Sequence, residues 1–273
     1  MLRSLLLALD DTPGAVAARD LAFAIARRHG AAVTGVLVLD RPHTLGLREP
    51  IPPGGAAFAE HRNRRLAEAV EAEAEAVLAA ARAAAGDLPF EVIRREDAPE
   101  EALLAAGAAH DLIVVGRDST LGREACDDGL SPTIEALLRD GARPLLVVPP
   151  GAAALAEGPV VIGYDGSIPA MRTVQLFALL GFAAAGPVRL LDCRADAPDL
   201  ESLAGYLRRH GCAVTAEPGA GDAHDALLAA ARALPARLLV LGADEEGGLA
   251  RLIFGSATAR LLRAAPCPVF IHG

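Results

Sequence analysis

The sequence predicts an α/β protein of two similar halves, each a doubly wound, mostly parallel five-stranded sheet with helices on both faces. Apolar strand-like runs alternate with helical segments along the whole chain, which is typical of parallel sheets covered by helices. A strand–loop–helix–strand layout occurs twice, from Asp111 to Pro149 and from Arg237 to His272. The 273 residues suit two domains, and 52% apolar residues suffice for a core in each.

The first half is predicted over residues 1–150. Its first helix ends in Arg27-Arg28-His29-Gly30, where basic residues oppose the helix dipole and the glycine supplies a left-handed cap. Ser131-Pro132 gives its last helix an N-cap residue and a first-turn proline. Strands are expected at 4–9, 32–39, 89–95, 111–116 and 144–149, and helices at 13–29, 58–86, 98–110 and 131–141.

The second half is predicted over residues 158–273, after a short alanine-rich link bracketed by Pro149-Pro150-Gly151 and Glu157-Gly158-Pro159. We expect the two halves to pack face to face as an internal pseudo-dimer, because each ends in a short apolar strand whose open edge needs cover. A further homo-oligomer is left open. Strands are expected at 159–164, 187–192, 212–217, 237–242 and 268–272, and helices at 168–183, 198–210, 222–234 and 256–265.

The two copies share a pair of glycines at the same spacing. Gly116 and Gly129 are 129 − 116 = 13 positions apart, and Gly242 and Gly255 are 255 − 242 = 13 positions apart. This repetition indicates a duplicated unit. Corresponding glycines of the two halves are 126 positions apart, whereas Leu137-Leu138-Arg139 and Leu261-Leu262-Arg263, in the helices that follow, are 124 positions apart. Ser131 is therefore an alternative partner of Gly255.

The candidate binding residues lie where strands end and helices begin. Asp165-Gly166 follows the first strand of the second half, at the edge where open α/β sheets bind ligands. Gly242 ends the fourth strand, and Gly255-Ser256 opens a helix whose N–H groups favour an anion. A turn and helix cap is the alternative interpretation of Asp165-Gly166-Ser167. The weaker equivalents in the first half are Asp10, Gly116 and Gly129.

Charge and composition argue against several classes of protein. A net charge of −9 argues against a nucleic-acid surface, and no apolar run reaches the length of a membrane span. We therefore expect a cytoplasmic protein. All 26 basic residues are arginine, and the lack of lysine excludes P-loop, kinase and Schiff-base mechanisms. Because no cysteine or histidine has the spacing of metal ligands, we assign no metal site and no catalytic residue.

The chain resembles the universal stress proteins, in the tandem form with two such domains, over essentially its whole length. The resemblance implies an adenine-nucleotide-hydrolase-like fold, a non-enzymatic stress-response role and ATP as the candidate ligand of the second half. The matching features are the carboxylates Asp10 and Asp165, the openings of the third helix at Asp97-Ala98-Pro99 and Asp222-Ala223, the glycine-rich loop, and the closing strands at 143–148 and 266–271.

The glycine motif departs from that of the ATP-binding branch, which has Gly, two residues, Gly, nine residues, then Gly-Ser or Gly-Thr. The second half has Glu245 in place of the middle glycine, and the first half has Ser119 there and Leu130 in place of the hydroxyl residue. Two unit charges about 6 Å apart repel by roughly 3 kcal/mol at a dielectric near 20. A helix N-terminus returns only about 0.3–1 kcal/mol. ATP therefore binds weakly or not at all, unless the carboxylates of Asp244-Glu245-Glu246 pair with Arg251 or Arg260, are bridged to phosphate by a divalent ion, or turn to solvent. Mg²⁺ is expected only with nucleotide.

Three function classes follow, of which the non-enzymatic stress-response module is favoured. An ATP-hydrolysing or adenylating enzyme of related fold is the alternative, although no nucleophile–base pair is evident; weak ATPase activity is left open. A phosphoacceptor receiver would need a lysine that the chain lacks. We expect the first half to be the poorer ligand site, because Leu130 offers no hydroxyl and acids crowd its loop. Its stretch Arg41–Ala57, rich in proline and glycine, is expected to be mobile or to serve as a lid or partner surface.

Overall fold

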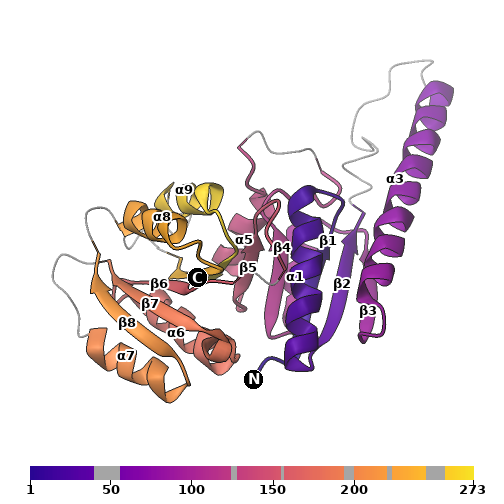
Figure 1. Ribbon diagram of the computed structural model, residues 1–273. Helices are drawn as coiled ribbons and strands as arrows, with labels where there is room; N and C mark the ends of the chain where they lie inside the picture. Colours follow the sequence, from indigo (N-terminus) through magenta and orange to yellow (C-terminus); the bar gives the residue numbers. More distant parts are fainter. Residues whose placement is uncertain (40–55, 124–127, 155–156, 194–199, 220–222, 244–255) are drawn as a thin grey trace.

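The chain folds into a single open sheet with helices on both faces. The structure is a computed structural model that describes residues 1–39, 56–123, 128–154, 157–193, 200–219, 223–243 and 256–273. Within these residues ten strands form one sheet, in the order β3-β2-β1-β4-β5-β10-β9-β6-β7-β8. The two halves have the same internal strand order, and Figure 1 shows them side by side, the first in indigo to magenta and the second in orange to yellow. The predicted α/β class is confirmed.

The order of elements in the first half agrees with the prediction, and the ends of the elements differ from the predicted ones by at most three residues. Residues 41–55 of the segment predicted as a mobile stretch, lid or partner surface lie outside the described residues, and its last two residues, 56–57, belong to the long helix. The elements are β1 (Ser4–Leu9), α1 (Pro13–His29), β2 (Ala32–Val38), α3 (Ala56–Ala85), β3 (Phe90–Arg95), α4 (Pro99–Gly107), β4 (Leu112–Gly116), α5 (Pro132–Asp140) and β5 (Leu145–Val148).

The second half differs from the prediction at one helix. The helix expected over 168–183 ends near Leu180, because Gly181 takes a left-handed conformation (φ 91°) and a short 3-10 helix follows. The elements are β6 (Val160–Tyr164), α6 (Ile168–Leu179), η1 (Phe182–Ala185), β7 (Pro187–Asp192), α7 (Leu200–Arg209), β8 (Ala213–Pro218), α8 (Ala223–Ala233), β9 (Leu238–Gly242), α9 (Ser256–Ala264) and β10 (Val269–His272).

Local signals position the first helix of each half. Thr12 caps α1 by accepting a hydrogen bond from the N–H of Ala15 at 3.3 Å, and Ser167 caps α6 through the N–H of Ala170 at 3.2 Å. Helix α1 ends at Gly30, which takes the left-handed conformation (φ 63°) that the sequence predicted. The two helices are therefore fixed at their N-termini by equivalent side chains.

The strands bury one cluster of apolar side chains on each face of the sheet. On β1, Leu5 and Leu7 pack beneath α1 and α3, whereas Leu6 and Ala8 face the side covered by α4 and α5. Helices α6 and α7 of the second half share the first face, and α8 and α9 share the second. Each core therefore continues from one half into the other.

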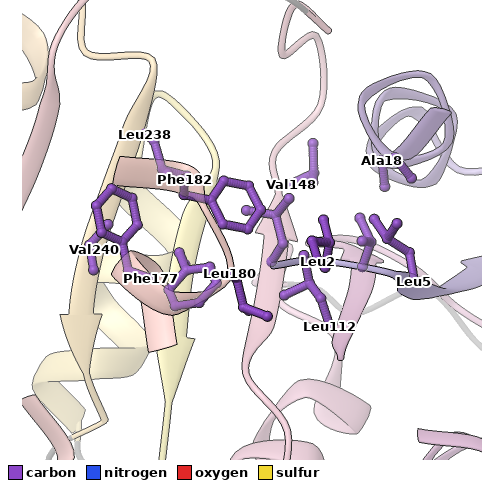
Figure 2. Packing of buried hydrophobic residues seen from close by; sticks show 14 of the residues in the cluster. Leu2, Leu5, Ala18, Leu112, Val148, Phe177, Leu180, Phe182, Leu238 and Val240 are labelled. Carbon is purple, nitrogen blue, oxygen red and sulfur yellow. The ribbon is translucent and has the colours of Figure 1, made fainter. Parts of the chain in front are cut away.

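The two halves join edge to edge through their last strands. Strand β5 pairs with β10 in antiparallel orientation, with Leu146 opposite Phe270. The prediction of a face-to-face pair is wrong in its geometry, because each open edge is covered by hydrogen bonds from the other instead of by a stacked sheet. Figure 2 shows Phe182 of the second half next to Val148 of the first, and Leu180 between Phe177 and Leu2.

Polar contacts at both ends of this junction fix it further. The N–H of Leu2 donates to the carbonyl of Leu180 at 3.1 Å, which ties the chain start to the second half. Arg117, after β4, donates to the carbonyl of Ala265 at the end of α9 at 3.1 Å. Arg263 forms an ion pair with Asp128 at 2.5 Å. The halves thus meet through backbone, apolar and charged contacts together.

Candidate functional site

Each half has a crevice at the carboxyl edge of the sheet, between its first and fourth strands. Chain connections leave β1 and β4 in opposite directions, because β2 follows on one side and β5 on the other. The same holds for β6 and β9 in the second half. Open α/β sheets bind ligands at such switch points. Asp10 and Gly116 lie at the first crevice, and Asp165 and Gly242 lie at the second.

In the first half, the loop that follows β4 is bonded to the carboxylate of Asp10. One oxygen of Asp10 accepts the N–H groups of Asp11 (2.6 Å) and Thr12 (3.1 Å). The other accepts the N–H of Leu121 at 2.7 Å and the hydroxyl of Thr120 at 3.2 Å. Hydrogen bonding to Asp10, burial and nearby acids raise the pKa of Asp11. Both oxygens of Asp10 are therefore engaged by the protein itself.

A second carboxylate of the same loop lies at the N-terminus of α1. The side chain of Asp118 accepts the N–H of Gly14, in the first turn of α1, at 2.9 Å. This is the place where a helix N-terminus would attract a ligand anion. Leu121 is almost fully buried and takes a left-handed conformation (φ 53°), which brings the loop across the crevice. Loop side chains thus satisfy the groups that a ligand would use.

In the second half, the carboxylate of Asp165 makes one hydrogen bond to the described residues. Its Oδ1 accepts the N–H of Ser167 at 2.8 Å, and Gly166 between them takes φ 75°. This turn agrees with the predicted cap, while the second oxygen of Asp165 has no partner in the described part of the chain. A cavity of about 120 Å³ next to it is lined by Gly163, Asp165, Ala170, Cys193, His224, Leu227, Leu241 and Gly242.

The strand-ending glycines contact the helices of their own domains. A Cβ added to Gly116 would lie 2.3 Å from the backbone nitrogen of Ala15, and one added to Gly242 would lie 2.4 Å from that of Ala170. We predicted that these glycines let backbone approach a ligand. The structure adds a nearer reason, since each lets a strand end pack against the first turn of α1 or α6.

The remaining predicted positions lie at or beyond the limits of the described residues. Gly255 and Glu245 lie outside them, and Ser256 is described only as the first residue of α9. Leu137 on α5 and Leu261 on α9, which are 261 − 137 = 124 positions apart, are both fully buried in the same core, and this favours Ser131 over Gly129 as the counterpart of Gly255. Ser131 occupies the N-cap position, but its side chain makes no capping hydrogen bond.

Sequence reasoning missed three residues of these crevices. Asp118 was considered only as one of the acidic residues that crowd the first-half loop. Cys193 and His224 were given no role, although both line the second crevice. The signal was positional: Cys193 follows β7 and His224 lies in the first turn of α8, so both fall at the carboxyl edge.

The described residues offer little for metal chemistry. They contain no group of three or more His, Cys, Asp or Glu side chains placed to hold a metal ion.

The described residues also include a structural cysteine. Burial raises the pKa of the Cys267 thiol to about 12, which disfavours the reactive thiolate. None of the described helices is both long and apolar enough to cross a membrane.

Comparison with known proteins gives one consistent family. The model of the universal stress protein family matches residues 1–149 and 190–272. A curated universal stress protein from Synechocystis sp. is 25% identical over 165 residues, which cover 58% of this chain and 56% of the relative. The match therefore spans about half the length of that relative.

Solved structures of the same family share the fold. The crystal structure of a universal stress protein from Archaeoglobus fulgidus superposes with a TM-score of 0.68 at 20% identity, and covers 98% of this chain and 95% of that one. A universal stress protein in complex with cAMP is 26% identical and aligns with 44% of this chain and 98% of that one, with a TM-score of 0.38.

Proposed function

Because the chain belongs to the universal stress protein family, in its tandem form, we propose that it is a non-enzymatic stress-response module with one nucleotide site. The site is the crevice between β6 and β9 of the second half. Its ligand is an adenine nucleotide, bound weakly. The first half serves as a structural partner, because the carboxylate at its crevice is already bonded to the protein's own loop.

The observation that carries this proposal is the difference between two equivalent carboxylates. Asp10 has both oxygens engaged, and its crevice is crossed by Leu121. Asp165 keeps one oxygen without a partner among the described residues. Both carboxylates line cavities, of about 180 Å³ at Asp10 and about 120 Å³ at Asp165, so the free oxygen is what distinguishes the second crevice. A carboxylate at this edge suits the hydroxyl groups of a ribose, which donate hydrogen bonds to it.

The volume of the second crevice limits the size of the ligand group that its described residues can enclose. About 120 Å³ lies below the range of about 300–1,000 Å³ for whole small-molecule pockets, so this part suits one sugar-sized group. We place the phosphates toward Gly242, Gly255 and Ser256, as the glycine motif suggests. Glu245 stands in the sequence where the ATP-binding motif has its middle glycine, and its charge would weaken the site by repulsion of the phosphates.

The junction between β5 and β10 supports a proposal about assembly. Two apolar strands with open edges would otherwise need cover from a second chain. Their pairing within one chain leaves the outer edges of the sheet at β3 and β8. We infer that the tandem chain acts as an internal pseudo-dimer and needs no second copy to cover its last strands.

The experiment uses calorimetric titration of the full chain with ATP, with and without magnesium. We expect weak binding by the wild type and tighter binding by Glu245→Gly, with a gain of at most about two powers of ten from the repulsion removed. Asp165→Asn should reduce the affinity of the Glu245→Gly protein, whereas Asp10→Asn, the matched change in the first half, should not. Tight wild-type binding that Glu245→Gly fails to improve would contradict the weakened site. An effect of Asp10→Asn alone would place the ligand in the wrong half.

A further inference from the structure

A second, larger cavity lies between the two halves, away from both crevices. It measures about 380 Å³ and is lined by the last turns of α1, by residues 153–154 and 157–158 of the link, and by the starts of β7 and β9. Those strand starts are at the amino edge of the second half, opposite the crevice at Asp165. The volume falls within the range of about 300–1,000 Å³ for ligand sites.

The walls of this cavity are apolar, and they come from both halves. Leu21 and Ile25 of α1 and Leu146 of β5 belong to the first half, whereas Phe182 and Leu238 belong to the second. Phe182 also contacts the ring of His29 at a centroid distance of 5.7 Å. An occupant of this cavity therefore needs an apolar body.

Two arginines line the cavity, one from each half. Arg28 lies in the last turn of α1, and Arg237 precedes β9, where its backbone N–H donates to the carbonyl of Pro159 at 3.1 Å. Neither arginine forms an ion pair within the described part of the chain, and the Nε of Arg237 is buried there without a hydrogen-bond partner. This Nε has almost no accessible surface, so a ligand in the cavity would contact Arg237 through its Nη atoms, which are not among the buried atoms without a partner.

Positive charge in this region is not balanced by the described residues. Burial lowers the pKa of Arg237, and the charge of Arg28 lowers it further. Burial also lowers the pKa of His29, with smaller contributions from Arg28 and the N-terminal ammonium group. The one acid among the described lining residues, Glu157, is solvent-exposed and pairs with neither arginine. A single negative charge inside the cavity would relieve this repulsion.

We propose that the cavity between the halves binds a monocarboxylate with an apolar chain, such as a medium-chain fatty acid. The carboxylate bridges Arg28 and Arg237, and the chain packs against Leu21, Ile25 and Phe182. Guanidinium groups match the planar geometry of a carboxylate and bind it in a bidentate manner. Glu157 at the cavity disfavours ligands with several negative charges, which distinguishes this site from a nucleotide site.

Such a ligand contacts both halves at once. It binds the folded chain and not the unfolded one, so it should raise the thermal unfolding midpoint in a concentration-dependent way. The inference does not rest on the proposed nucleotide site, which lies at the opposite edge of the sheet and uses none of these side chains. Either proposal can therefore fail alone.

The test is calorimetric titration of the full chain with sodium decanoate, below the concentration at which it forms micelles. We expect saturable binding of one decanoate per chain. Arg237→Gln and Arg28→Gln should each weaken it by about tenfold or more, the range for a lost hydrogen bond to a charged group. Arg65→Gln, which removes the same charge from an exposed position on α3, should leave the affinity unchanged.

Three results would overturn the proposal. One is the absence of saturable decanoate binding to the wild type. Another is an affinity of the Arg28→Gln protein equal to that of the wild type; because Arg28 is exposed, this variant should fold even where Arg237→Gln does not. The third is equal affinity for decanol, which has the same chain without the charge and would indicate a purely apolar cavity.

Discussion

Replacement of Phe270 by alanine should destabilise both halves together. The ring is fully buried on β10, opposite Leu146 of the first half, with ring centroids 6.1 Å from Phe177 and 5.5 Å from Phe182. Truncation of a buried phenylalanine costs about 3–5 kcal/mol through lost transfer energy and the cavity that remains. Unfolding entropy of about 2.1 cal/mol/K per residue over 273 residues gives about 0.57 kcal/mol/K. The unfolding midpoint should therefore fall by about 5–9 °C.

Differential scanning calorimetry measures this effect directly. It suits a chain that has no tryptophan and only two tyrosines, at 164 and 206, both in the second half. Phe58→Ala is the matched control, because Phe58 is 77% exposed on α3 and its loss should change the stability by less than about 0.5 kcal/mol. The reasoning would be refuted if Phe270→Ala moved the midpoint no more than Phe58→Ala. A separate, unshifted transition of the first half would refute the shared core.

Two further predictions concern glycine geometry and two partly buried histidines. Gly242→Ala should lower the free energy of unfolding by about 1–3 kcal/mol, because the new Cβ would lie 2.4 Å from a backbone nitrogen in the first turn of α6. The matched change Gly205→Ala on α7 should raise it by about 0.5–1 kcal/mol, because its Cβ meets no atom within 4 Å. Denaturant titration that ranks these variants in the opposite order would contradict this. Burial lowers the pKa of His29 and His272 from the ordinary 6.5, so the unfolded chain binds more protons and stability is lost as the pH falls below about 6.5. A His29→Gln/His272→Gln protein should show a smaller loss, whereas His61→Gln, at an exposed site on α3, should behave as wild type.

The order and type of the elements could be predicted because they depend on local signals. Alternating apolar runs fixed the strands, and caps such as Thr12 and Gly30 set the helix ends within a few residues. The break at Gly181 was missed, because the preceding apolar helical pattern continues through it and only the left-handed backbone ends the helix. The periodicity of apolar residues does not indicate where the backbone takes a left-handed conformation.

The arrangement of the two halves could not be predicted in the same way. Open strand edges can be covered by stacking or by pairing, and the pairing of Leu146 with Phe270 depends on contacts between residues far apart in the sequence. The bonding of the first-half loop across its crevice has the same origin. Asp118 reaches the N–H of Gly14 across 104 positions, so a local count of acidic residues does not reveal its partner.

The central claim is that one crevice per chain binds an adenine nucleotide, and that it lies in the second half. The most direct test is the stoichiometry of ATP bound by the Glu245→Gly protein, measured by equilibrium dialysis at saturating nucleotide. We predict one ATP per chain, lost when Asp165 is also changed to asparagine and retained when Asp10 is changed instead. Two ATP molecules per chain, or one that disappears only with Asp10→Asn, would contradict the claim.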